Sequence, residues 1–264
     1  MKTSGKTLAE KVKQIKDSNM LSVRSDSLPT WCPGCGYFGI HQGLNNAIQQ
    51  LGLLHHKIVN VTGIGCAGRY AFFTNTYGCH VVHGRILPVA TGIKMANPEL
   101  TVFAVGGDGD GLAIGAGHFP HMVRRNVDVN YLLFDNSIFG LTKGQISPTS
   151  PIGAVSKASP SGNVDRPLNA TLMALSYGAT FVARLFAGDP EQNTEILKEG
   201  IQHKGFALFH FFSSCVTFDK VYKTWGNLKD KVHPMPASYD SSDLKQAIIH
   251  VLEDDFSMGI IYKR

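Results

Sequence analysis

The chain has 264 residues, 43% hydrophobic and 17% charged, so it can bury a large core and is not intrinsically disordered. Its net charge of +5 is too small and too scattered to predict binding to nucleic acid. The sequence has no apolar run of the roughly 20 residues that a membrane helix needs. Its lysine-rich first residues also lack the apolar block of a secretory signal. We therefore expect a cytoplasmic protein that binds neither nucleic acid nor a membrane.

Residues 1–30 are predicted to form a polar extension, and strands alternate with helices after it. The expected strands are Ile58–Thr62, Thr101–Val105, Val129–Phe134, Thr180–Leu185 and Phe206–Phe211. The expected helices are Tyr37–Leu51, Ile86–Ala96, Ala113–Arg125, Leu168–Tyr177, Pro190–His203 and Asp243–Leu252. This alternation predicts an α/β fold with a parallel sheet and helices on both of its faces.

Two segments interrupt the alternation. Gln145–Pro167 is rich in proline, serine and glycine, and it predicts a long loop that either covers an active site or contacts another subunit. We expect residues 31–218 to form one domain. Residues 219–264 form a C-terminal tail that either completes this domain or contacts a partner subunit.

Four cysteines occupy turn-like positions that could face one another. Cys32 and Cys35 form a Cys-Pro-Gly-Cys-Gly turn, while Cys66 and Cys215 each follow an expected strand. Such a set could hold zinc or an iron–sulfur cluster, although one Cys-x-x-Cys pair alone fits a redox disulfide equally well. Cys79 is the cysteine that we expect to be left out.

A glycine-rich turn follows the expected strand that ends at Val105, and it contains the sequence Gly107-Asp108-Gly109. Glycines at such a turn let the backbone approach a phosphate, and an adjacent aspartate can hold Mg²⁺. The next strand ends at Asp135-Asn136, which would add an amide oxygen. The alternative interpretation is an aspartate that caps a helix together with an Asx turn.

Together these motifs resemble a known family. Gly107-Asp108-Gly109 followed by Asp135-Asn136 is similar to the thiamine diphosphate motif. In combination with the cysteine turns, His83-Gly84-Arg85 and Ala90-Thr91-Gly92, the chain resembles the β subunits of 2-oxoacid:ferredoxin oxidoreductases from about Trp31 to Phe218.

The resemblance implies a thiamine diphosphate-binding fold and a set of site residues. The implied ligands of a [4Fe–4S] cluster are Cys32, Cys35, Cys66 and Cys215. The implied Mg²⁺ ligands are Asp108, Asn136 and the carbonyl of Ile138. The implied contacts of thiamine diphosphate are Ile64, Gly65, Cys66, Ala67, His83, Gly84, Arg85, Ile86, Gly109, Asp110, Gly140 and Leu141.

The resemblance also implies an activity and partners. Such an enzyme oxidatively decarboxylates a 2-oxoacid, transfers the acyl group to coenzyme A and passes electrons through the cluster to ferredoxin. The chain shows no second cofactor-binding domain, so we expect a companion α subunit to supply the pyrimidine-binding half and its activating glutamate. The isolated chain is then expected to be inactive.

The segment Phe139–Gln145 resembles the 2-oxoglutarate and broad-range branch more than the pyruvate-specific one. Lys143 could place an ammonium near the distal carboxylate of 2-oxoglutarate, and Arg69 is a second cation for a substrate carboxylate or a coenzyme A phosphate. Pyruvate or a broad range of 2-oxoacids remains the alternative substrate. A non-redox thiamine enzyme and a cysteine-ligated zinc regulatory module remain the alternative functions.

Overall fold

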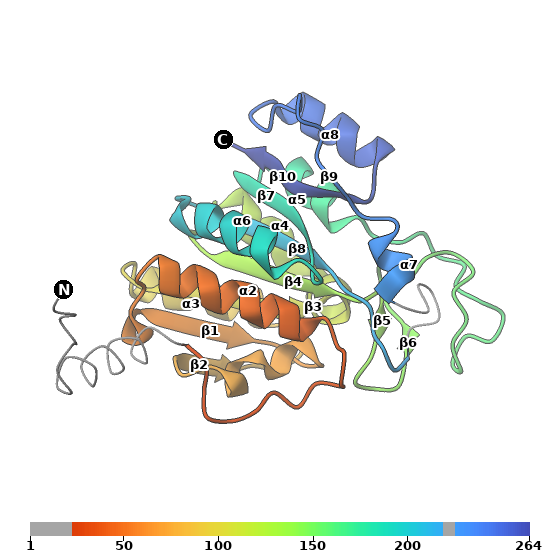
Figure 1. Ribbon diagram of the computed structural model, residues 1–264, viewed down its shortest axis with the longest axis horizontal. Helices are drawn as coiled ribbons and strands as arrows, with labels where there is room; N and C mark the ends of the chain where they lie inside the picture. Colours follow the sequence, from red (N-terminus) through yellow and green to blue (C-terminus); the bar gives the residue numbers. More distant parts are fainter. Residues whose placement is uncertain (1–22, 219–224) are drawn as a thin grey trace, which may run out of the picture.

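In this computed structural model, residues 23–218 and 225–264 are described. The main sheet has eight strands in the order β2-β1-β3-β4-β8-β7-β10-β9 (Figure 1). These strands are β1 Ile58–Thr62, β2 Tyr77–His80, β3 Thr101–Gly107, β4 Asn130–Asp135, β7 Phe181–Phe186, β8 Ala207–Phe212, β9 His233–Pro234 and β10 Ser257–Lys263. A separate hairpin consists of β5 Ile138–Phe139 and β6 Gln145–Ile146.

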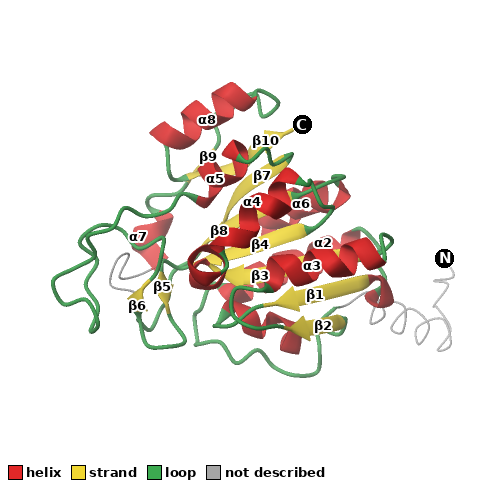
Figure 2. Cartoon of the chain, turned by 180° about the vertical axis from the view of Figure 1, so that it is seen from behind, coloured by secondary structure: helices red, strands yellow, loops and turns green. Residues whose placement is uncertain are grey.

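Helices cover both faces of the sheet, as Figures 1 and 2 show from opposite sides. They are α2 Tyr37–Gln50, α3 Ile86–Ala96, α4 Phe119–Arg124, α5 Ala170–Ser176, α6 Pro190–Gln202, α7 Trp225–Lys229 and α8 Leu244–Glu253. Buried side chains of α3, α4, α5 and α8 form a core on one face, and those of α2 and α6 form a core on the other. The α/β fold with helices on both faces is therefore confirmed.

The central strands explain how one sheet supports two cores. Along β3, Val102 and Ala104 belong to one core, whereas Phe103 and Val105 belong to the other. This alternation follows from the period of two in a strand, and it explains why strands covered on both faces consist mostly of apolar residues. Burial of such side chains contributes roughly 1.5–3 kcal/mol each, which makes the sheet centre a rigid base for the turns at its edge.

Most predicted elements are confirmed. For one strand and one helix, both ends of the predicted range match the structure: Ile58–Thr62 and Ile86–Ala96. The single helix predicted over Ala113–Arg125 is wrong. The chain instead forms a π-helical turn at Asp110–Ile114, a 3₁₀ turn at Ala116–His118 and only then α4. Glycines at 115 and 117 weaken a continuous helix, and a proline at position 120 favours a new helical start.

Strands β2, β9 and β10 and the β5–β6 hairpin were not predicted from the sequence. β10 runs antiparallel to β7, so the sheet is not parallel throughout. Because β10 lies in the predicted C-terminal tail and α8 packs into a core, this tail completes the main sheet. Its expected contact with a partner subunit stays a prediction.

The predicted extension 1–30 falls mostly on residues 1–22, which lie outside the described residues. Within the ranges that the structure describes, no helix has the length and apolar character that a bilayer span requires. The cytoplasmic location stays a prediction.

Candidate active site

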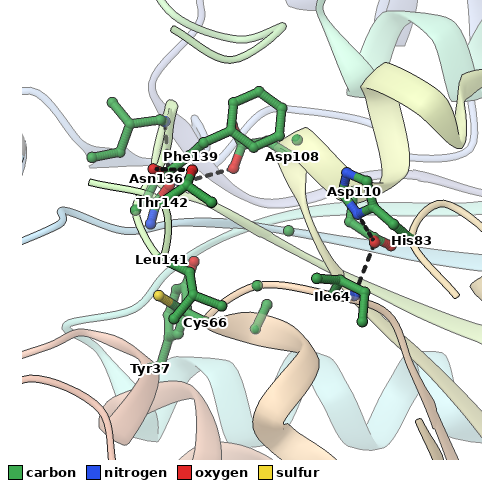
Figure 3. Close-up of a pocket in the computed structure, with 16 residues that line it drawn as sticks. Tyr37, Ile64, Cys66, His83, Asp108, Asp110, Asn136, Phe139, Leu141 and Thr142 are labelled. Carbon is green, nitrogen blue, oxygen red and sulfur yellow. Dashed lines mark hydrogen bonds and ion pairs between the residues drawn. The ribbon is translucent and has the colours of Figure 1, made fainter. Parts of the chain in front are cut away.

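The carboxyl ends of β1, β3 and β4 meet at one edge of the sheet because these strands are neighbouring and parallel. A cavity of about 260 Å³ opens there (Figure 3). Its lining residues are Tyr37, Ile64, Gly65, Cys66, Ala67, His83, Gly107, Asp108, Gly109, Asp110, Asn136, Ile138, Phe139, Gly140, Leu141 and Thr142. We call this cavity the cofactor pocket.

Asp108 begins the turn after β3 and is buried, with an exposed fraction of 2%. Its Oδ1 accepts a hydrogen bond from the backbone N–H of Asn136 at 3.4 Å, and its Oδ2 lies 3.1 Å from Oγ1 of Thr149. Burial, and then the charge of nearby Asp135, raises the pKa of Asp108 to about 8. A cation beside this carboxylate would therefore remove a large electrostatic cost.

The segment after β4 forms a tight turn through Asn136, Ser137 and Ile138. Ser137 has a φ of 56°, a left-handed conformation that is unfavourable for a residue with a side chain. Two side-chain oxygens, one from a carboxylate and one from an amide, hold this turn. Oδ1 of Asp135 accepts from the backbone N–H of Ser137 at 2.9 Å, and Oδ1 of Asn136 accepts from that of Ile138 at 3.2 Å.

These two turns bring together oxygen donors that fit Mg²⁺. Asp108 offers a carboxylate, Asn136 a side-chain amide oxygen and Ile138 a backbone carbonyl, and all three residues line the cofactor pocket. Hard oxygen ligands of this kind are the ones that Mg²⁺ prefers. The sequence-predicted metal set is thus assembled on one side of the pocket, and the donor chemistry fits the ion.

Asp110 ties three loops together at the opposite side of the pocket. Its Oδ1 accepts from the backbone N–H groups of Ile64 and Gly84 at 2.9 and 3.0 Å, and it lies 2.6 Å from Nδ1 of His83. Its Oδ2 is buried without a partner in the described chain. A Cβ on Gly63 would lie only 2.1 Å from this oxygen, so the close approach of the two loops requires glycine there.

The four predicted cysteine ligands line a second cavity of about 150 Å³, which we call the cysteine cavity. The Cys32–Cys35 turn closes through a backbone hydrogen bond of 3.0 Å between their amide and carbonyl groups, with Gly34 at a φ of 80°. The indole of Trp31 donates to the carbonyl of Cys66 at 2.8 Å. Cys66 borders both cavities, which also share Tyr37, Asn136, Gly140 and Leu141.

The environment of the thiols indicates that they face one another. Burial, opposed by a backbone hydrogen bond and reinforced by the charges of Cys66, Cys215 and Cys32, raises the pKa of Cys35 to about 12. A Cβ on Gly140 would lie 3.6 Å from Sγ of Cys215 and 3.7 Å from Sγ of Cys66. Gly140 therefore borders both of these sulfurs.

In the described part of the chain, the five cysteines form no disulfide, and no three His, Cys, Asp or Glu side chains are arranged to hold a single metal ion.

Some predicted residues lie elsewhere. Arg69 borders the cysteine cavity and not the cofactor pocket. Lys143 is exposed, has a φ of 81° and is absent from the lining of both cavities. Three of the implied cofactor contacts, Gly84, Arg85 and Ile86, are absent from the lining of the cofactor pocket. The backbone N–H of Gly84 donates instead to Asp110.

Several residues of the site were not predicted from the sequence. Tyr37, Phe139 and Thr142 line the cofactor pocket, and Thr149 reaches Asp108 from the long loop. Phe139 leaves no room for a side chain at position 109, since a Cβ there would lie 2.2 Å from its ring. No local pattern marks Thr149, whose role depends on how the loop folds back.

Known proteins resemble this chain along most of its length. Residues 57–211 match the family "Thiamine pyrophosphate enzyme, C-terminal TPP binding domain", and residues 215–264 match the C-terminal region of the pyruvate ferredoxin oxidoreductase beta subunit. The 2-oxoacid:ferredoxin oxidoreductase subunit beta of Saccharolobus solfataricus is 46% identical over 88% of this chain and 81% of its own length. The chain belongs to the β subunits of the 2-oxoacid:ferredoxin oxidoreductases.

Two further relatives carry more specific names. The 2-oxoglutarate oxidoreductase subunit KorB of Mycobacterium tuberculosis is 45% identical over 74% of this chain, and the match spans about half (52%) of that protein. A structure of the 2-oxoglutarate:ferredoxin oxidoreductase from Magnetococcus marinus, with 2-oxoglutarate, coenzyme A and succinyl-CoA bound, is 44% identical. It superposes with a TM-score of 0.89 over 92% of this chain and 84% of that one. The family predicted from the motifs is confirmed, and residues 57–211 are a thiamine diphosphate-binding domain.

Proposed function

We propose that this chain is the β subunit of a 2-oxoglutarate:ferredoxin oxidoreductase. The enzyme would oxidatively decarboxylate 2-oxoglutarate with coenzyme A, release succinyl-CoA and CO₂, and reduce ferredoxin. The observation that carries this proposal is the shared wall of the two cavities, because Cys66, Gly140 and Leu141 border both. Chemistry in the cofactor pocket would then lie next to a group that accepts electrons.

Asp108, Asn136 and the carbonyl of Ile138 would hold Mg²⁺, and the glycine turn around Gly107 would let backbone amides approach the diphosphate. When bound, thiamine diphosphate supplies the electron sink for decarboxylation, and an iron–sulfur cluster accepts electrons one at a time. Asp110 and His83 would fix the wall opposite the metal. The chain's own task in the cofactor pocket is to bind and orient.

Cys32, Cys35, Cys66 and Cys215 would hold a [4Fe–4S] cluster in the cysteine cavity. Cys32 is exposed whereas Cys35, Cys66 and Cys215 are partly buried, so one side of the cavity faces the surface of the described chain. A ferredoxin could approach there. The pyrimidine half of the cofactor and its activating glutamate would come from a companion α subunit, which leaves the isolated chain inactive.

The test is an anaerobic purification of this chain together with its α subunit. We expect a brown protein with four irons per β subunit that reduces ferredoxin only when 2-oxoglutarate, coenzyme A, Mg²⁺ and thiamine diphosphate are all present. Comparable turnover of pyruvate would assign the broad-range alternative. A colourless, zinc-loaded protein without activity would contradict the proposal.

A further inference from the structure

A line of buried polar side chains runs behind the Asn136–Ile138 turn, and of its members only Asp135 has a role in the site described above. Asp135 Oδ2 lies 2.9 Å from Nε2 of His210, and Nδ1 of His210 lies 3.1 Å from Oγ1 of Thr171. Nε of Arg184 donates to the same Oγ1 at 3.2 Å. These four side chains are at most 6% exposed, so each depends on its neighbours for hydrogen bonds.

The donors and acceptors along this line fix the direction of its hydrogen bonds. A carboxylate only accepts, so the hydrogen of a neutral His210 imidazole lies on Nε2 and points to Asp135. Nδ1 then accepts from the hydroxyl of Thr171, which in turn accepts from Nε of Arg184. Arg184 also donates to the backbone carbonyl of Asp254 at 2.5 Å, which anchors the line at the end of α8.

Asp135 connects this line of hydrogen bonds to the turn that carries two of the three proposed Mg²⁺ ligands. Its Oδ2 binds His210, and its Oδ1 accepts from the backbone N–H and the hydroxyl of Ser137 at 2.9 and 3.3 Å. The same Oδ1 lies 2.7 Å from Oγ1 of Thr149, closer than Asp108 at 3.1 Å. The hydroxyl of Thr149 thus lies within hydrogen-bond distance of both carboxylates and joins the long loop to this turn.

We propose that His210 is a positioning residue for the metal and diphosphate of the cofactor: by holding the carboxylate of Asp135 it fixes the left-handed turn at Ser137. This inference rests on the proposed function, since it assumes that Asp108, Asn136 and Ile138 bind Mg²⁺. His210 touches none of these three residues through a hydrogen bond in the described chain. Its effect on the metal would act through Asp135.

A variant that lacks the imidazole is expected to fold. A cavity of about 290 Å³ borders Asp135, Thr149, Arg184 and His210, so water can reach the carboxylate of Asp135 when it loses its hydrogen bond to the imidazole. His210→Phe keeps a ring of similar size and removes both hydrogen bonds. His210→Gln can still donate from its amide nitrogen to Asp135, which makes it the rescue variant.

The experiment titrates Mg²⁺ into the complex with its α subunit at saturating thiamine diphosphate, and binding is measured by calorimetry. We expect His210→Phe to lose about 10- to 100-fold in Mg²⁺ affinity, the range typical for partners that orient metal ligands. We expect His210→Gln to bind with nearly the affinity of the unsubstituted chain. Phe209→Leu is the matched control, because Phe209 is buried on the same strand but belongs to the opposite core.

The outcomes separate this inference from the proposed function. If His210→Phe binds Mg²⁺ as tightly as the unsubstituted chain, the positioning role is overturned and the Mg²⁺ site stands. An equal loss in His210→Phe, His210→Gln and Phe209→Leu would also overturn it, because general destabilisation would then explain the effect. If the unsubstituted complex binds no Mg²⁺ with thiamine diphosphate, the proposed site itself fails and the inference with it. Iron content, which we expect to be equal in all variants, shows that each one is assembled.

Discussion

The cofactor pocket is framed by the ends of parallel strands, whereas the cysteine cavity next to it is framed almost entirely by turns. Asp108 and Asn136 directly follow β3 and β4, whose hydrogen bonds fix the register between them. Cys32 and Cys35 belong instead to a turn that depends on a left-handed glycine, and Cys215 follows the last paired residue of β8. The pocket should therefore be preformed, and the cysteine cavity should depend more on the group that it holds.

The largest effect that we expect is the loss of the cluster in Cys215→Ser, without loss of cofactor binding. Cys215→Ser removes a sulfur that borders only the cysteine cavity, so iron content and ferredoxin reduction should be abolished while Mg²⁺-dependent binding of thiamine diphosphate persists. Iron analysis and calorimetry on the anaerobic complex measure the two properties. Cys66→Ser should also abolish the cluster, but it borders both cavities and can change both properties.

Cys79→Ser is the control for these variants, because Cys79 lies on β2 and outside the lining of both cavities. It should leave iron and activity nearly unchanged. Loss of the cluster in Cys79→Ser would show that the proposed set of ligands is wrong.

In contrast to Cys215→Ser, Asp108→Ala should weaken cofactor binding and leave the cluster in place. This change removes the charged oxygen ligand from the cofactor pocket, at a cost of about 3 kcal/mol or roughly a hundredfold in affinity for thiamine diphosphate with Mg²⁺. Iron content should remain that of the unsubstituted chain. Calorimetry with the assembled complex measures the affinity, and unchanged binding would remove Asp108 from the metal site.

The two regions also differ in how well the sequence predicted them. The strand ends at Val105 and Phe134 could be located because doubly covered strands are continuous apolar runs, and the chemistry-bearing residues follow at once. Edge elements gave no such signal, since β2 and β9 are short and exposed and β10 pairs antiparallel. The cysteine ligands came from a family resemblance, because spacing alone left zinc, a cluster and a disulfide open.

Residues that act through other residues could not be predicted. Thr149 lies in the long loop and His210 in an otherwise apolar strand, and only the tertiary fold brings them to Asp135. The placement of Lys143 at the strand end was predicted, but the structure turns it outward at a left-handed position. Its role in specificity stays a prediction that kinetics can decide.

Lys143→Ala tests whether Lys143 sets the preference for 2-oxoglutarate over pyruvate. If the ammonium meets the distal carboxylate of 2-oxoglutarate in the assembled enzyme, kcat/KM for that substrate should fall about tenfold, which corresponds to about 1.4 kcal/mol. The loss for pyruvate, which has no distal carboxylate, should be much smaller. Lys143→Arg keeps the charge and should retain most of the preference. Equal losses on both substrates would exclude Lys143 as the specificity residue.

The smallest difference we expect is in sensitivity to acid, and it arises from the aromatic cluster behind the cysteine cavity. His41 lies in this cluster beside Trp31 and Tyr70, and its ring nitrogen Nδ1 is buried without a partner in the described chain. Burial, and then the charge of Arg24, lowers the pKa of His41 to about 4. The folded chain therefore keeps His41 neutral where the unfolded chain already takes up a proton.

Stability should accordingly fall as the pH drops from about 6.5 toward 4, by at most about 1.4 kcal/mol for each pH unit. His41→Phe keeps the ring packing but has no group to protonate, so its unfolding midpoint should depend less on pH in this window. Guanidinium unfolding followed by tryptophan fluorescence at pH 7 and pH 5, with both proteins compared at each pH, measures the difference. Parallel pH dependences would show that His41 is not the acid-sensitive group, and the cysteine region would then be no more sensitive to acid than the strand-built pocket beside it.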